Sequence, residues 1–210
     1  MAEKGLKVLR EPVYRLIDPV VRLLIRLRIH PNVISSVGFV ATLAAGLSYH
    51  QDHVRTAGLL VLFGGIVDIF DGRVARESGL ESKFGAFYDS TLDRLSEVVV
   101  FVGLASLYNT IRPDVEDVAM IYVILMALGG SLLVSYTRAR AEGLGLDCKV
   151  GLMQRAERVV LLGLGSLIFG LAWNGLVLDL IIIVVAVLTN LTAIQRIVWV
   201  YHHGKGVPLE

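Results

Sequence analysis

The chain has 210 residues, of which 55% are hydrophobic and 19% are charged, with a net charge of +1. Its mean hydropathy of +0.68 excludes an ordinary soluble domain and indicates an integral membrane protein. The single cysteine, Cys148, excludes an internal disulfide, and we expect no nucleic-acid partner.

Residues 1–30 are predicted to form a juxtamembrane segment without a cleavable signal peptide. Within it, apolar residues recur at helical spacing over 12–29, while Arg15, Arg22 and Arg26 fall largely on another face. This pattern predicts an amphipathic helix on the membrane surface, serving either as a simple anchor or as part of the lipid entrance.

The rest of the chain predicts an all-α membrane protein with one domain, residues 1–210, whose core is 31–201. Pro31 ends the juxtamembrane segment, and Asn32 or Ser35 is the expected N-cap of the next helix. Apolar runs of near-spanning length then predict six transmembrane helices: 33–49, 56–76, 83–108, 115–140, 151–172 and 176–201.

The distribution of positive charge predicts the orientation of these helices. Of the 20 Lys and Arg residues, only Arg55 and Arg112 fall in the loops 50–55 and 109–114, which share one side. The positive-inside rule therefore predicts a protein of the cytoplasmic membrane, with both termini on the cytoplasmic side.

Four aspartates lie where the second predicted helix ends and the third begins. Asp68 and Asp71 are three residues apart, and Asp89 and Asp93 are four apart, so each pair shares one helix face. Four carboxylates next to apolar segments repel one another, and a divalent cation relieves that repulsion. Hard oxygen ligands suit Mg²⁺ or Mn²⁺.

Small residues accompany these aspartates. Gly72, Ala75 and Gly85 remove side chains from the surface beside the carboxylates and leave room for a ligand, whose phosphate Arg76 can meet. For any single glycine, helix packing is the simpler explanation, since small residues are common at membrane helix interfaces.

The complete pattern is Asp68-x2-Asp71-Gly72-x2-Ala75-Arg76-x8-Gly85-x3-Asp89-x3-Asp93. It resembles the signature of the CDP-alcohol phosphotransferase family at every defining position. The resemblance implies two metal ions, one bound by Asp68, Asp71 and Asp89 and the other by Asp68, Asp89 and Asp93. It also implies that Asp93 is the base, that the enzyme is a homodimer, and that the CDP-lipid site is lined by Asn32, Ser35, Gly72, Ala75, Arg76, Ser82 and Gly85.

A second group of candidate residues is basic. Five arginines lie at the predicted cytoplasmic helix ends, and a guanidinium suits bidentate phosphate binding: Arg138, Arg140, Arg155, Arg158 and Arg196. Snorkelling of arginines to the membrane surface is the alternative. Arg94 and Glu97 are expected to form a local ion pair.

The segments SYTRARAE and QRAER resemble the branch of the family that makes phosphatidylinositol phosphate, although Arg138 replaces the usual lysine. The resemblance implies that the phosphate of inositol 1-phosphate is held by Ser135, Arg138, Arg155, Arg158 and Arg196. The predicted reaction transfers the phosphatidyl group from CDP-diacylglycerol to this acceptor. Glycerol 3-phosphate is the alternative acceptor, and an ion transporter is a remote alternative function.

Overall fold

A computed structural model describes residues 17–111 and 115–205, and every regular element within these ranges is helical. Helix 17–26 is followed by α2 (Pro31–His50), α3 (Val54–Ser78), α4 (Lys83–Ile111), α5 (Val115–Glu142), α6 (Arg155–Phe169), the short 3₁₀ helix η1 (Ala172–Gly175) and α7 (Leu176–Gly204). The predicted all-α class is confirmed.

Three helical stretches are long and apolar enough to cross a membrane: Pro31–His50, Val118–Glu142 and Ala172–Gly204. They establish a membrane protein, as the hydropathy predicts. The helix α6 has 15 residues, fewer than the roughly 20 that span a bilayer. The count of six spans therefore stays a prediction.

Three predicted helix starts differ from the structure. Helix α3 begins at Val54 instead of residue 56. Helix α2 begins at Pro31, and its N-cap is His30, whose Nδ1 accepts a hydrogen bond from the backbone N–H of Asn32 at 3.2 Å. Helix α6 begins at Arg155 instead of residue 151, because the preceding backbone binds elsewhere. The N–H groups of Leu152 and Met153 donate to Thr192 Oγ1 on α7 at 3.2 and 3.0 Å.

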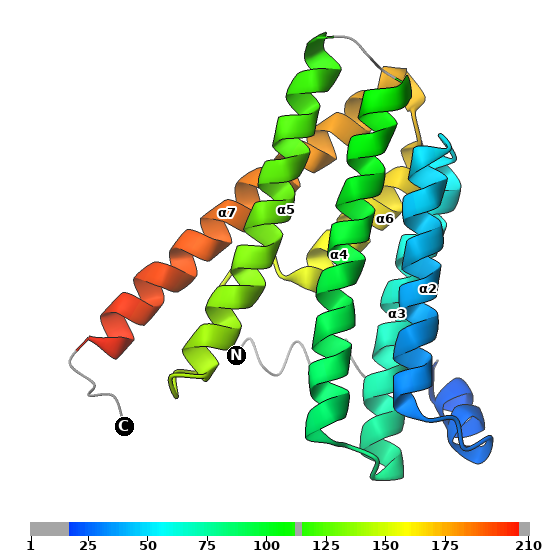
Figure 1. Ribbon diagram of the computed structural model, residues 1–210, viewed down its shortest axis with the longest axis vertical. Helices are drawn as coiled ribbons and strands as arrows, with labels where there is room; N and C mark the ends of the chain where they lie inside the picture. Colours follow the sequence, from blue (N-terminus) through cyan, green and yellow to red (C-terminus); the bar gives the residue numbers. More distant parts are fainter. Residues whose placement is uncertain (1–16, 112–114, 206–210) are drawn as a thin grey trace.

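Helix α2 packs against both α3 and α4, α6 packs against α3, and α5 packs along α7 (Figure 1). Glycines allow close approach at two of these contacts. A Cβ on Gly103 of α4 would lie 2.7 Å from the carbonyl oxygen of Gly46 on α2, and one on Gly58 of α3 would lie 2.6 Å from that of Gly163 on α6. These contacts fix the helices that carry the aspartates and Arg155.

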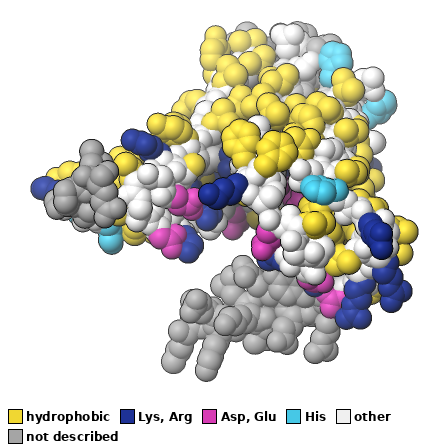
Figure 2. Space-filling view, turned by 60° about the horizontal axis from the view of Figure 1, so that its bottom comes forward, with side chains coloured by type: hydrophobic (Ala, Val, Ile, Leu, Met, Phe, Trp, Pro, Cys, Tyr) yellow, Lys and Arg dark blue, Asp and Glu magenta, His cyan; other side chains and the backbone are white. Residues whose placement is uncertain are grey.

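The turn between α3 and α4 and the C-terminal ends of α5 and α7 lie toward the same end of the molecule (Figure 1). Charged side chains gather at this end, and hydrophobic side chains cover the surface beyond it (Figure 2). The first part of the predicted amphipathic helix 12–29, up to residue 16, and Arg112 lie outside the described residues; residues 17–26 are helical.

Candidate active site

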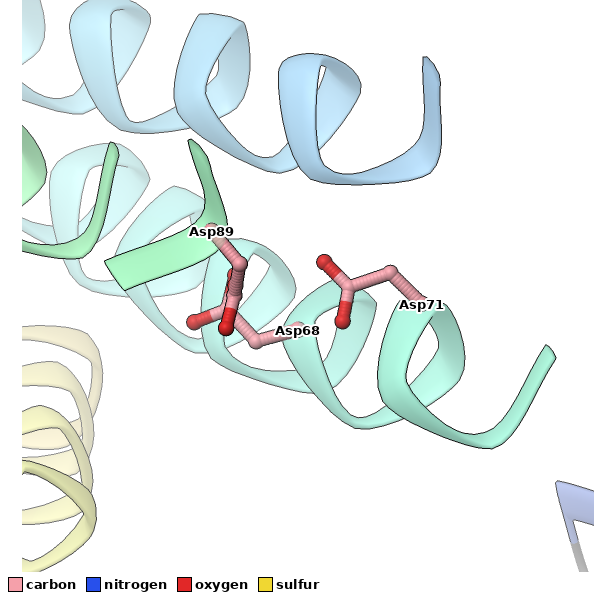
Figure 3. Close-up of side chains that lie close together, drawn as sticks. All are labelled: Asp68, Asp71 and Asp89. Carbon is pink, nitrogen blue, oxygen red and sulfur yellow. The ribbon is translucent and has the colours of Figure 1, made fainter. Parts of the chain in front are cut away.

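Three of the four predicted aspartates form a cluster between α3 and α4 (Figure 3). Asp68 and Asp71 lie on α3 and Asp89 lies on α4, and one carboxylate oxygen from each is within 4.8 Å of the others. Three converging hard oxygen donors fit a divalent cation such as Mg²⁺ or Mn²⁺. Three of the four predicted metal ligands are thus brought together by two helices joined through a tight turn.

Helix α2 contributes an orienting contact to this cluster. Ser35 Oγ donates a hydrogen bond of 2.5 Å to Asp71 Oδ2, and both side chains are buried. This hydrogen bond fixes the orientation of the Asp71 carboxylate, as hydrogen-bond partners of metal ligands commonly do. Ser35 therefore acts on Asp71 directly, besides bordering the neighbouring pocket.

Asp93, the predicted base, lies one turn beyond Asp89 on α4 and contacts Arg155 of α6. The Arg155 Nη2 group lies 2.8 Å from Asp93 Oδ1, while its Nη1 group donates to Asp68 Oδ2. A single guanidinium thus joins a member of the metal cluster to the predicted base. The sequence suggested Arg155 only as a phosphate ligand.

A pocket of about 210 Å³ opens beside the cluster, between α2, α3 and the start of α4. Asp71 and Asp89 border it, together with all seven residues predicted to bind the CDP-lipid: Asn32, Ser35, Gly72, Ala75, Arg76, Ser82 and Gly85. Sequence reasoning missed Pro31, Leu80, Glu81 and Ala86, which also line it. Leu80 and Glu81 lie in the turn before Ser82, Ala86 follows Gly85 on α4, and Pro31 precedes Asn32 on α2. This proximity in the chain to predicted pocket residues was the available signal.

Local structure explains how the α3–α4 turn shapes this pocket. Gly79 ends α3 with φ of 69°, a left-handed conformation that suits glycine. Ser82 then precedes α4, and its Oγ accepts a hydrogen bond of 2.9 Å from the N–H of Gly85. A Cβ on Gly85 would come within 3.4 Å of Asn32 Oδ1, so glycine keeps this wall of the pocket open.

Two of the predicted acceptor arginines are buried and bonded within the protein. Arg158 is 2% exposed and binds Glu97, with its Nε group 3.1 Å from Glu97 Oε1. The expected pairing of Arg94 with Glu97 is wrong, because Glu97 points across to α6 and Arg94 lies 3.7 Å from Asp93.

Arg196 is also 2% exposed and joins α7 to two other segments. Its Nε group donates to the carbonyl oxygen of Val150 at 2.8 Å, and its Nη1 group donates to that of Val134 on α5. Arg196 therefore ties α7 to α5 and to the segment that precedes α6.

The remaining acceptor candidates lie at the end of α5. Arg138 is partly exposed and pairs with Glu142 at 2.8 Å, and Ser135 Oγ donates to the carbonyl oxygen of Ser131 at 3.2 Å. Arg196 lies within electrostatic range of Arg138 and Arg158. The structure thus groups these three arginines, whereas Arg155 lies with the aspartates.

Known proteins share this arrangement over most of the chain. The sequence profile of the CDP-alcohol phosphatidyltransferase family matches residues 28–194. The chain belongs to this family. The family predicted from the aspartate spacing is thereby confirmed, and the chain is an enzyme of the CDP-alcohol phosphatidyltransferase class.

Two curated relatives extend the comparison beyond the family. The archaetidylinositol phosphate synthase of Methanothermobacter thermautotrophicus is 36% identical, with 97% of each chain covered. The phosphatidylinositol phosphate synthase of Streptomyces avermitilis is 33% identical, with 89% of this chain and 78% of that protein covered. The predicted likeness to enzymes that make inositol phosphate lipids is confirmed.

Solved structures agree with the fold of this CDP-alcohol phosphatidyltransferase. The Mycobacterium tuberculosis phosphatidylinositol phosphate synthase with CDP-DAG bound superposes with a TM-score of 0.79 at 29% identity, covering 89% of this chain and 94% of that one. The same enzyme in complex with manganese and citrate gives a TM-score of 0.78 at 30% identity, with 87% and 88% covered.

Proposed function

We propose that this protein transfers the phosphatidyl group of CDP-diacylglycerol to inositol 1-phosphate, which releases CMP and forms phosphatidylinositol phosphate. The observation that carries the proposal is the cluster of Asp68, Asp71 and Asp89 directly beside a pocket of about 210 Å³. Relatives along almost the full chain are named for inositol phosphate lipid synthesis, which supports the acceptor.

The metal requirement follows from the donor set. Asp68, Asp71 and Asp89 would hold one divalent ion, and Asp68, Asp89 and Asp93 would hold a second. When bound, Mg²⁺ or Mn²⁺ supplies charge neutralisation for the diphosphate and for the departing CMP. The manganese complex of the mycobacterial enzyme supports divalent metal binding.

The chemistry at the protein's own residues is proton transfer and positioning. The acceptor hydroxyl gives its proton to the Asp93 carboxylate as its oxygen bonds to the lipid-bearing phosphorus. The bond from that phosphorus to the CMP oxygen breaks, and CMP leaves with the electron pair. Asn32, Ser35, Gly72, Ala75, Arg76, Ser82 and Gly85 would hold the CDP-lipid.

The acceptor phosphate would be bound by Ser135, Arg138, Arg155, Arg158 and Arg196. The grouping of Arg138, Arg158 and Arg196 supports this assignment. Their present partners, Glu142, Glu97 and two backbone carbonyls, also hold the guanidinium groups in place. Glycerol 3-phosphate is the second candidate acceptor, since it carries the same phosphate.

The membrane arrangement is part of the proposal. Helices α2 to α7 would form six spans of one domain, residues 1–210, in the cytoplasmic membrane, with both termini and the site facing the cytoplasm. The enzyme would be a homodimer. The gathering of the aspartates at one end of α3 and α4 supports a site at the membrane surface and argues against an ion path.

An acceptor panel tests the reaction. The purified full chain is incubated with labelled CDP-diacylglycerol, with its archaetidyl counterpart, or without a lipid donor as the blank. Each mixture then receives inositol 1-phosphate, inositol, glycerol 3-phosphate or serine. We expect CMP release and labelled lipid product with inositol 1-phosphate. Faster turnover with glycerol 3-phosphate would show that glycerol 3-phosphate, and not inositol 1-phosphate, is the acceptor. An absence of CMP release with every acceptor would refute the reaction.

A further inference from the structure

Arg155 holds two carboxylates that the proposed reaction needs for other purposes. Its Nη1 group binds Asp68 and its Nη2 group lies 2.8 Å from Asp93 Oδ1. Asp68 belongs to the metal cluster, and Asp93 is the proposed base. A cation coordinated at Asp93 would share these oxygens with a positive guanidinium and would be repelled by it.

One nitrogen of the Arg155 guanidinium makes no hydrogen bond to the described residues. Among the described residues, Arg155 Nε is a buried donor without a partner, and Glu97 Oε2 is a buried acceptor without one. Both side chains border a cavity of about 30 Å³, together with Arg158. The unbonded Nε leaves the present position of Arg155 incompletely stabilised.

The proposed acceptor-phosphate site includes a residue on the same helix as Arg155. Arg158 is one turn further along α6, and Arg158 belongs with Arg138 and Arg196 to the group that would bind the acceptor phosphate. An arginine that moved toward a phosphate there would exchange two carboxylates for a group that it binds in bidentate fashion.

Resting on the proposed function, we propose that Arg155 exchanges between the Asp68–Asp93 pair and the phosphate of the acceptor. While Arg155 holds Asp93, the metal position at Asp93 binds its cation weakly and the base is engaged. When the acceptor phosphate takes Arg155, both carboxylates become free. Acceptor binding and metal binding at Asp93 then strengthen each other, and by linkage the factor is the same in both directions.

Mn²⁺ binding to the purified full chain tests this exchange without turnover. Free Mn²⁺ is measured by electron paramagnetic resonance in the absence of CDP-lipid, with inositol 1-phosphate, glycerol 3-phosphate, inorganic phosphate or free inositol added in turn. In the wild type we expect inositol 1-phosphate to tighten the weaker Mn²⁺ class by a factor of about 5 to 150, the usual range of coupling between sites. Free inositol, which has no phosphate, should have no effect.

The variant Arg155→Gln should bind the weaker Mn²⁺ more tightly than the wild type before any acceptor is added, and inositol 1-phosphate should add nothing. Arg155→Lys keeps the positive charge but cannot bind two carboxylates through one planar guanidinium. Its affinity for the weaker Mn²⁺ should therefore lie between those of the wild type and Arg155→Gln. Arg55→Gln removes one positive charge from an exposed position at the start of α3, at the opposite end of that helix from the aspartates, and should match the wild type.

Unchanged or weaker Mn²⁺ binding in Arg155→Gln would overturn the exchange, as would equal tightening by inositol 1-phosphate in the variant and the wild type. If Arg155→Gln does not fold, a failure of inositol 1-phosphate and every other phosphate to tighten Mn²⁺ binding in the wild type overturns it instead. Tightening by glycerol 3-phosphate alone would support the exchange and refute the proposed acceptor.

Discussion

Ser35 on α2 donates a 2.5 Å hydrogen bond to Asp71 on α3, and this bond orients one carboxylate of the metal cluster. The variant Ser35→Ala should therefore raise the Mn²⁺ concentration needed for half-maximal CMP release by about 10- to 100-fold, as loss of such an orienting partner typically does. Ser48→Ala is the matched control, because the hydrogen bond of Ser48 Oγ among the described residues stays within α2, to the carbonyl oxygen of Ala44 at 2.8 Å. An unchanged Mn²⁺ requirement in Ser35→Ala would show that Asp71 is held by other contacts.

Removal of divalent cations should abolish activity, because the three carboxylates of Asp68, Asp71 and Asp89 converge and Arg155, which pairs with Asp68, supplies only one positive charge. We expect EDTA to stop CMP release and Mg²⁺ or Mn²⁺ to restore it. Asp68→Asn and Asp89→Asn should be inactive at any metal concentration, since each residue would serve both ions. Asp52→Asn, at the opposite end of α2, should be unaffected, because asparagine tolerates its φ of 65°. Turnover in excess chelator would contradict the metal mechanism.

The role of Asp93 as the base is checked by Asp93→Asn, which keeps the shape but cannot accept the proton. Turnover at saturating Mg²⁺ should fall by about 10²-fold or more. CDP-diacylglycerol binding should persist, since Asp93 does not line the pocket beside α2. Parallel metal titrations separate loss of the base from loss of a metal ligand. Near wild-type turnover would rule Asp93 out.

The pocket beside the cluster should bind CDP-diacylglycerol more weakly when a larger side chain replaces Gly85. In Gly85→Leu the new side chain starts 3.1 Å from Ser82 Oγ and 3.4 Å from Asn32 Oδ1. Overfilling of a packed site costs about 1–3 kcal/mol, so we expect the KM for CDP-diacylglycerol to rise about 5- to 150-fold. Gly129→Leu on α5 is the control, because no atom lies within 4 Å of its added Cβ. A normal KM in Gly85→Leu would place the CDP-lipid elsewhere.

Variants of the buried Arg158–Glu97 pair should distinguish a structural role of Arg158 from a role in acceptor binding. Arg158→Met leaves a buried carboxylate without its partner and should lower the free energy of unfolding by about 3–5 kcal/mol. The double variant Arg158→Met/Glu97→Leu should recover most of that loss in thermal unfolding, because it removes both charges. If Arg158 also binds the acceptor phosphate, the double variant is stable but has a raised KM for the acceptor. Recovery of both properties would limit Arg158 to a structural role.

Some partners in the site could not be read from the chain. Arg94 and Glu97 are three residues apart and looked like a local pair, yet Glu97 binds Arg158, 61 residues further on. The cap expected from Asn32 or Ser35 is made by His30 instead, and Ser35 faces Asp71. Local spacing shows which side chains can meet on one helix, but competition from a neighbouring helix decides which contact forms.

The sequence by itself determined the helical class, the membrane environment, the family and the two aspartate pairs, because hydropathy and the 3.6-residue helical repeat are local properties. Together with the family resemblance, it also predicted seven residues that border the pocket, whereas Pro31, Leu80, Glu81 and Ala86 were missed. Only the tertiary structure decided that Arg155 bridges Asp68 and Asp93 and that Arg158 and Arg196 are buried within the fold. Those contacts depend on the rotation and depth at which α6 and α7 pack, and packing of that kind is set by glycine contacts between helices that are far apart in the chain.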